Sequence, residues 1–451
     1  MKKHQGKGPF RKPPAKKNLH ASPFLTAVVA NAAGEIFDLD GYAAVGRDGP
    51  LLAPLTSAAT VPLPHGSELM RLPDRMPILY DMARGCMVTL PEDPYAPGQA
   101  IFPVAAFNSP GYLLTAVSAY EENSGAGHLP LFSYGALGWH RGKFRSAVIQ
   151  VDAEPRQDLR QMPLEKIQAG VRRLRKELPD NRLRAHLEKC ALTYGCPAGK
   201  NFFLARYEAP LPTSPSCNAR CLGCISLQAE GDIPCSQERI AFTPSPREIA
   251  AVALAHIRRV KQAVVSFGQG CEGDPLLAAD TISAAIELIR AETDQGTIHM
   301  NTNGSLPQKI DQVIAAGLDS LRISLNSVRQ PCYDAYFRPK GYSFDQVLAA
   351  IDTAASRGVF VAINYLNCPG FTDTPQESRA LLSFLKDHAV RMIQWRNLNF
   401  DPLRYLAAMN RAAAHDAPIG VEPLLAKVRQ TFPALRHGYF NPPKESFSRQ
   451  G

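Results

Sequence analysis

The chain has 451 residues, of which 45% are hydrophobic and 20% are charged. This balance is typical of globular proteins and argues against a largely disordered chain, a fibre or a coiled coil. No apolar run approaches the roughly 18 residues that a membrane-spanning helix needs, so we expect no membrane segment.

The net charge of +9 comes mostly from the start of the chain. Residues 1–20 hold seven lysines and arginines and no acidic residue, together with several glycines and prolines. This composition predicts a disordered basic tail, which either keeps the protein soluble or makes weak, salt-sensitive contact with RNA. The rest of the chain is nearly neutral, so we do not expect a basic nucleic-acid-binding domain.

Residues 21–150 contain short apolar runs between turns rich in glycine and proline. The runs 100–107 and 113–119 predict strands, and the segments 63–67 and 92–98 predict turns. We expect a β-rich accessory domain here, without a recognisable catalytic motif.

Residues 151–200 have a helical pattern instead. Leu164, Ile167, Val171, Leu174 and Leu178 recur at intervals of three and four residues, with charged residues between them. This periodicity predicts an amphipathic helical linker between two domains.

Residues 201–415 alternate between apolar runs and helical stretches. The predicted strands are 202–211, 262–267, 297–302, 320–325, 359–366 and 391–399, and the predicted helices are 246–259, 276–292, 306–316, 344–357 and 375–388. Such alternation predicts an α/β fold with a parallel sheet and right-handed crossovers. A partial (β/α)6 barrel and a doubly wound open sheet both fit, and both place the active site beyond the carboxyl ends of the strands. Residues 416–451 predict a C-terminal helix and tail.

Three cysteines follow the first predicted strand of this series: Cys217, Cys221 and Cys224. Three thiolates at C-x3-C-x2-C spacing can hold three irons of a [4Fe-4S] cluster and leave the fourth iron open. The alternatives are buried free thiols, or a structural zinc ion with a distant fourth ligand in a metal-stabilised binding module. Close thiols of this kind are typical of a reducing compartment, so we expect a cytoplasmic protein.

A glycine-rich motif follows the second predicted strand. Gly268, Gly270 and Gly273 match G-x-G-x-x-G between a strand and a helix, with Asp294 about 20 residues further on. This motif offers a rival interpretation, a nucleotide-dependent oxidoreductase that uses NAD or FAD.

The cysteine spacing at the end of a first strand resembles that of the radical S-adenosylmethionine (SAM) superfamily, over roughly residues 205–400. The resemblance implies that Cys217, Cys221 and Cys224 hold a [4Fe-4S] cluster and that SAM binds the open iron. It further implies reductive cleavage of SAM to a 5′-deoxyadenosyl radical, which takes hydrogen from a substrate that the sequence does not identify. A flavodoxin- or ferredoxin-type protein would supply the electron. One position departs from the pattern, because the residue before the last cysteine is usually aromatic and here is Gly223.

The same resemblance implies several contacts to SAM. The segment 272–275 is similar to the Gly-Gly-Glu-Pro motif of the superfamily, which makes Gly273 and Asp274 candidate SAM-binding residues. Asn303, in a Thr-Asn-Gly segment, and Ser324, in a Ser-Leu-Asn segment, occupy corresponding strand ends. An acidic group would suit the ammonium of SAM, and glycine allows close approach of the backbone.

Two arginines are candidates for an anionic group. Arg338 follows the fourth predicted strand, and Arg396 lies on the sixth. Each could hold the carboxylate of SAM or an anion of the substrate, and the alternative for each is a surface ion pair.

The other cysteines have no recognised spacing. Cys190 and Cys196 could ligate an auxiliary cluster, with partners among Cys235, Cys271, Cys332 and Cys368. Buried structural thiols are the simpler expectation. No cysteine follows Cys368, so the cysteine-rich C-terminal extension of peptide-modifying members is absent from this sequence.

Overall fold

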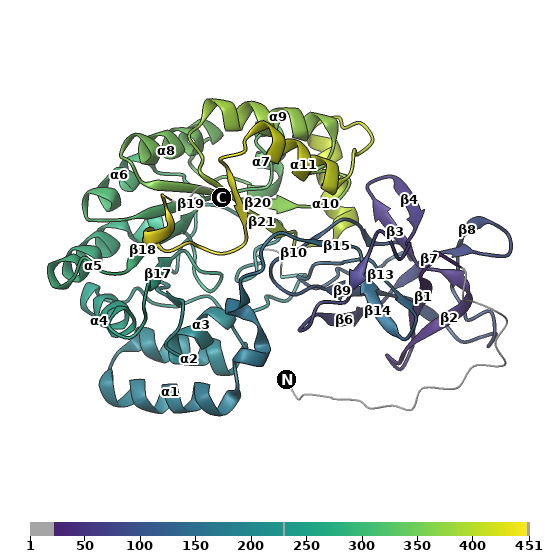
Figure 1. Cartoon of the computed structure of the whole chain (residues 1–451), viewed down its shortest axis with the longest axis horizontal. Coiled ribbons are helices and arrows are strands. Elements are labelled where there is room, and N and C mark those ends of the chain that lie inside the picture. The colour runs from purple at the N-terminus through teal and green to yellow at the C-terminus, as the bar shows by residue number, and fades with distance from the viewer. Residues whose placement is uncertain (1–21, 229–230, 449–451) are drawn as a thin grey trace.

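The computed structural model describes residues 22–228 and 231–448. The predicted basic tail, residues 1–20, lies outside the described residues. Figure 1 shows a parallel sheet with its helices on one side of the picture and the N-terminal strands on the other. No helix of the described chain is long and apolar enough to cross a membrane.

The parallel sheet contains seven strands. They are β16 (Glu208–Pro210), β17 (Val264–Phe267), β18 (Thr297–Thr302), β19 (Ser320–Leu325), β20 (Phe360–Asn367), β21 (Met392–Asn397) and β22 (Arg436–Gly438). Their order across the sheet is their order in the chain. A doubly wound sheet reverses its strand order at the ligand site, so this order identifies the curled half-barrel that the sequence left as one of two alternatives.

The helices between these strands are α4 (Pro246–Ile257), α5 (Ala279–Glu292), α6 (Pro307–Ala315), α7 (Gln330–Phe337), α8 (Phe344–Ser356), α9 (Pro375–Asp387), α10 (Pro402–Ala412) and α11 (Val421–Thr431), with the 3-10 turn η3 (Pro275–Ala278) before α5. Their starts follow from local sequence. Ser245 and Glu248 form a capping box that begins α4, and Ser343 and Gln346 do the same for α8.

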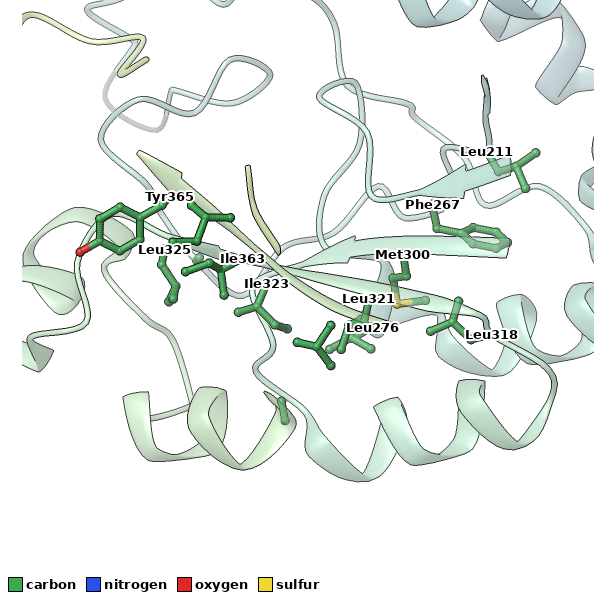
Figure 2. Packing of buried hydrophobic residues seen from close by; sticks show 14 of the residues in the cluster. Leu211, Phe267, Leu276, Met300, Leu318, Leu321, Ile323, Leu325, Ile363 and Tyr365 are labelled. Atoms are coloured by element: carbon green, nitrogen blue, oxygen red, sulfur yellow. The ribbon is translucent and has the colours of Figure 1, made fainter. Parts of the chain in front are cut away.

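The core of the half-barrel lies between the sheet and its helices. On β19, Leu321, Ile323 and Leu325 are fully buried in this layer, and Figure 2 shows them beside Ile363 of β20. Because side chains alternate along a strand, Arg322 between them points to the opposite face, inside the curl of the sheet.

Four features of the barrel differ from the predicted elements. The predicted strand 202–211 begins as a helix, α3 (Pro197–Phe203), and only β16 is extended. A short apolar run does not distinguish helix from strand, and left-handed backbone at Ala205 and Tyr207 separates the two elements. Helix α7 and strand β22 were not predicted, because neither has an apolar run that stands out from its surroundings. Helix α10 was not predicted either.

The helical segment before the barrel is divided into several short elements, namely η1 (Pro155–Gln157), η2 (Leu159–Gln161), α1 (Leu164–Glu177), α2 (Arg182–Leu192) and α3. The predicted apolar stripe is present, since Ile167, Val171 and Leu174 are buried. These residues belong to the same hydrophobic core as the barrel strands. Helices α2 and α3 contact the barrel at α4 and β16, and α1 packs against α2 and α3.

The N-terminal region is antiparallel. Its strands are β1 (Thr26–Asn31), β2 (Ile36–Ala43), β3 (Val45–Asp48), β4 (Leu51–Pro54), β5 (Val61–Pro62), β6 (Glu68–Arg71), β7 (Arg75–Asp81), β8 (Cys86–Thr89), β9 (Ile101–Phe107), β10 (Tyr112–Leu114), β11 (Val117–Ser118), β12 (Tyr120–Glu122), β13 (Leu137–His140), β14 (Lys143–Ser146) and β15 (Val148–Gln150). Strand β9 occupies the predicted run 100–107. The predicted run 113–119 is split, because its halves pair with β15 and β3 respectively.

The N-terminal strands contact the carboxyl ends of the barrel strands. The Asn397 side chain, at the end of β21, accepts a hydrogen bond from the Leu114 amide at 2.9 Å, and Asn367 of β20 donates to the Leu114 carbonyl at 2.9 Å. Asp401 pairs with the buried Arg75 at 3.3 Å. The N-terminal region therefore covers part of the mouth of the half-barrel.

Candidate active site

The loop between β16 and α4 carries the three predicted ligands, Cys217, Cys221 and Cys224. Its backbone is fixed to the end of α7, where Arg220 donates to the Phe337 carbonyl at 2.9 Å and Leu222 donates to the Tyr336 carbonyl at 3.0 Å. The three thiols are free and only partly buried. The loop thus presents them together on a rigid support.

The electrostatic surroundings suit a cationic cluster. Burial, and to a lesser extent the charge of Asp274, raises the pKa of Cys217 to about 11. Burial also raises the pKa of Cys221, and the nearby charges of Cys224 and Cys217 add to that effect. Arg239 donates to the Cys224 sulfur at 3.5 Å. Thiols that resist ionisation together become thiolates when a metal takes up their charge, so this donor set fits the [4Fe-4S] cluster.

Glu272 closes the glycine-rich loop. Its carboxylate is buried and accepts backbone hydrogen bonds from Gly268 and Gln269 at 2.7 Å each, and from Thr213 at 2.7 Å and Ser214 at 3.0 Å. Burial raises its pKa to about 7, against the lowering effect of these four N–H groups.

These contacts correct the dinucleotide interpretation of Gly268, Gly270 and Gly273. In a dinucleotide-binding loop, the backbone N–H groups of the turn point at a pyrophosphate. Here the N–H groups of Gly268 and Gln269 are bound by the Glu272 carboxylate. Moreover, η3 separates the loop from the start of α5.

Gly273 brings the two loops into contact. A Cβ atom at this position would lie 1.8 Å from the Ser216 carbonyl oxygen. The Gly273 amide donates to the Ser214 carbonyl at 2.6 Å, and the Asp274 amide donates to the Ser216 carbonyl at 2.9 Å. Only glycine permits this approach, which sets the position of the chain next to Cys217.

Asp274 and Asn303 lie in the same network. The buried Asp274 carboxylate accepts from the Thr302 hydroxyl at 2.8 Å and from the Asn303 amide at 2.7 Å. The Asn303 side chain donates to Asn218, inside the cysteine loop, at 2.8 Å. The Asp274 carboxylate therefore holds the chain at residues 302–303, and the Asn303 side chain links that segment to the cysteine loop.

A polar cavity of about 330 Å³ opens beside this loop, inside the curl of the sheet. Its lining is drawn from the cysteine loop, the glycine-rich loop, the strand ends and the N-terminal region: Phe107, Asn108, Ser109, Ser133, Gln157, Ala198, Glu208, Gly223, Gly268, Gln269, Gly270, Asn301, Arg322, Tyr336, Asn364, Leu366, Arg396, Asn397, Asn399, Tyr439, Phe440 and Asn441. Of the predicted SAM-binding residues, only Arg396 is in this lining. Ser324 is half-buried on β19, and Arg338 is exposed at the end of α7.

The cavity is electrostatically positive. Burial, and to a lesser extent the charge of the neighbouring Arg396, lowers the pKa of Arg322 to about 9. Glu208 is the acidic side chain among the described lining residues. The Arg322 Nε and the Asn364 Oδ1 are buried without hydrogen-bond partners in the described chain. Two guanidinium groups and uncommitted polar atoms make this cavity suited to an anionic ligand.

Tyr336 lies next to Gly223, the position at which the sequence departs from the usual aromatic residue. Its hydroxyl oxygen is 3.0 Å from the point that a Cβ atom of Gly223 would occupy. The buried Tyr336 of α7 thus brings its hydroxyl group next to the position from which the usual aromatic side chain would start.

Sequence reasoning missed Arg322, Tyr336 and the N-terminal lining residues. Arg322 had a signal, since a charged residue between Leu321 and Ile323 in a barrel strand points inward. Tyr336 lies on an unpredicted helix, and nothing in the sequence around Asn108 connects it with the barrel.

Residues 211–382 match the model of the radical SAM superfamily. This domain belongs to the radical SAM superfamily. Enzymes of this superfamily use a [4Fe-4S] cluster and S-adenosylmethionine. Radical SAM enzymes also require an external reductant.

The chain is similar to the GTP 3′,8-cyclase of Paenarthrobacter nicotinovorans, with 26% identity over 193 residues. The match covers 42% of this chain and 51% of that protein, so it spans about half the length of the curated relative.

Among solved structures, a radical SAM methyltransferase from Sphaerobacter thermophilus is 16% identical with a TM-score of 0.36, covering 50% of this chain and 63% of that chain. Methylornithine synthase is 16% identical with a TM-score of 0.37, covering 59% and 76% respectively.

Proposed function

We propose that this radical SAM enzyme acts on a small polar substrate with an anionic group, held in the cavity beside the cysteine loop. One observation carries the proposal: Gly223, next to Cys224, lines the same cavity as Arg322 and Arg396. Cys217, Cys221 and Cys224 would hold the cluster. When bound, the cluster and SAM supply a 5′-deoxyadenosyl radical that takes a hydrogen atom from the substrate.

The residues of this chain have two kinds of role in the proposal. Gly268 and Gly270 line the cavity without a side chain, so SAM can lie against the backbone there. Tyr336 offers the aromatic surface beside the adenine. Asp274 and Asn303 act as positioning residues, because Asp274 holds the Asn303 backbone and the Asn303 side chain contacts the cysteine loop.

The size of the cavity limits the substrate. Ligand cavities typically measure about 300–1,000 Å³, and a cavity near the lower limit must also accept part of SAM. The substrate is therefore smaller than a nucleoside triphosphate, although the relative named above is a GTP cyclase. Phe107 to Ser109 of the N-terminal region complete the wall and exclude water.

The partners follow from the same proposal. A flavodoxin- or ferredoxin-type protein would deliver the electron to the cluster. Contact of the basic tail with RNA remains a separate prediction, as does a cytoplasmic location.

The test measures which compounds raise the rate of 5′-deoxyadenosine formation above the uncoupled rate. Reduced, cluster-loaded protein with SAM is supplied with a set of small carboxylates, phosphates and neutral analogues. We expect stimulation by anionic compounds. Arg322→Gln and Arg396→Gln should each reduce that stimulation by about 10- to 100-fold in apparent affinity, the effect of losing a charge-assisted hydrogen bond.

The matched control is Arg338→Gln, since Arg338 is exposed and outside the cavity lining. It should respond to the anions as the wild type does. Stimulation by neutral compounds alone, or undiminished stimulation in both cavity variants, would contradict the proposed substrate class.

A further inference from the structure

A second group of metal-ligating side chains lies behind the glycine-rich loop. His186 and Cys190 on α2 meet Cys271 of the loop after β17, and their ligand atoms all lie within 4.8 Å of one another. The Cys190 sulfur is 3.5 Å from His186 Nε2. Residues four apart on a helix share a face, so α2 presents both groups to Cys271.

Cys196 provides a fourth donor. It lies at the start of α3, and its backbone N–H donates to the Cys190 carbonyl at 3.0 Å. Burial is the main cause that raises the pKa of Cys196, and the charge of Cys190 raises it by a smaller amount. The charge of Cys196 likewise raises the pKa of Cys271. Cys196 is outside the group whose ligand atoms lie within 4.8 Å of one another, so its side chain would have to move toward the ion to become the fourth ligand.

We propose that His186, Cys190, Cys196 and Cys271 bind a single zinc ion, at a site separate from the iron–sulfur cluster. A Cys3His donor set is typical of structural zinc. Two thiolates at ~2.3 Å from one tetrahedral ion are about 3.8 Å apart, which the observed spacing allows with little movement. The three cysteines of this site are among those for which the sequence left open buried thiols or an auxiliary cluster.

The spacing favours one ion over an auxiliary iron–sulfur cluster. In a cubane, each thiolate binds a different iron, so the sulfur atoms lie farther apart than two ligands of one ion. Imidazole and thiolate together are donors that zinc accepts readily. The cluster ligands form a distinct group, because Cys217, Cys221 and Cys224 lie on the loop between β16 and α4 and none of them belongs to the His186, Cys190 and Cys271 group.

The site would connect the helical segment to the cysteine loop. Cys271 precedes Glu272, whose carboxylate holds Thr213 and Ser214 at the start of that loop. The Cys271 carbonyl also accepts from the Ile240 amide at 2.7 Å. A metal ion at Cys271 would therefore fix α2 and the loops around the cluster relative to one another.

The test uses the full chain with Cys217, Cys221 and Cys224 changed to Ala, which removes the cluster ligands. Protein produced with both iron and zinc in the medium should retain about one zinc and no stoichiometric iron, as four closed positions imply. Replacing zinc by cobalt should give the intense visible absorption of tetrahedral cobalt with thiolate-to-metal charge transfer. Stoichiometric iron, or no bound metal, in this variant would overturn the proposal.

A double variant with two controls tests where the zinc ion binds. Cys190→Ser combined with Cys271→Ser in the cluster-free background should lower zinc content at least tenfold. Cys86→Ser and Cys235→Ser serve as controls, because both cysteines are exposed. Unchanged zinc in the double variant would place the metal elsewhere and contradict the assignment. If the double variant does not fold, the cobalt spectrum of the cluster-free chain still decides whether thiolates bind the ion.

Discussion

Two buried carboxylates hold the glycine-rich loop against the loop that carries the cysteines. Glu272 accepts four backbone hydrogen bonds, two from each loop. Asp274 accepts from Thr302 and Asn303. Burial raises the pKa of each acid, and the N–H donors oppose that rise. These side chains stabilise the shape of the site, whereas Arg322 and Arg396 present charge to its interior.

Gly273→Ala tests the contact between the glycine-rich loop and the cysteine loop by adding one methyl group. The added methyl group would lie 1.8 Å from the Ser216 carbonyl oxygen, so the two loops must separate. We expect at least a several-fold loss of bound iron and lower thermal stability, measured by iron analysis and calorimetry. Gly127→Ala is the control, because a Cβ atom there meets no atom within 4 Å. Full iron content in Gly273→Ala would show that the contact between the loops does not support the cluster.

The half-barrel places polar side chains at the carboxyl ends of apolar strands. This was predictable, because each buried strand and amphipathic helix has its own periodicity, and strands β17 to β21 lie where the sequence indicates. The cysteine motif was predictable for the same reason, since its spacing is local. Helix α7 was not, although its carbonyls at Tyr336 and Phe337 fix the cysteine loop. Its eight residues are too few for a clear apolar period.

Leu187→Ala tests whether α2 belongs to the barrel core. Leu187 is fully buried and packs in the same core as the barrel strands. Its truncation should destabilise the protein by about 2–5 kcal/mol. A single unfolding transition, shifted as a whole in calorimetry, is the expected result. Leu192→Ala is the matched control, because Leu192 is 40% exposed. A separate, earlier transition of the helices alone would show that they fold as an independent linker.

At the scale of the whole molecule, the N-terminal region covers the barrel mouth. Asn108 and Ser133 line the cavity, and Leu114 is hydrogen-bonded to Asn367 and Asn397 at the strand ends. Contacts between residues this distant in sequence leave no periodic signal, so the composition of residues 21–150 could indicate strands but not their place over the site. The two-arginine cavity was missed in part for this reason.

A pair of acids at this interface predicts a pH dependence. Burial, and then the facing carboxyl of Asp373, raises the pKa of Asp48 to about 8. An unfolded aspartate has a pKa of about 3.9, so between these values the folded state binds the extra proton. Stability should therefore fall as the pH rises from about 4 to about 8.

Asp48→Asn removes this dependence. At pH 8 we expect its midpoint temperature to exceed that of the wild type by a few degrees, roughly the effect of 1 kcal/mol. At pH 5 the two should differ little. Asp38→Asn is the control, because Asp38 is exposed. An equal difference between Asp48→Asn and the wild type at both pH values would contradict the raised pKa of Asp48.

The most direct test of the central claim is the formation of 5′-deoxyadenosine by the anaerobic, reduced protein with SAM. The wild type should contain about four irons at the three-cysteine loop and convert SAM to 5′-deoxyadenosine, even slowly and without its substrate. The variant with Cys217, Cys221 and Cys224 changed to Ala should lose both the iron and the product. NAD should neither bind to the wild type nor be turned over. Product formation in the cysteine variant, or no product from wild-type protein with an intact, reduced cluster, would contradict the account.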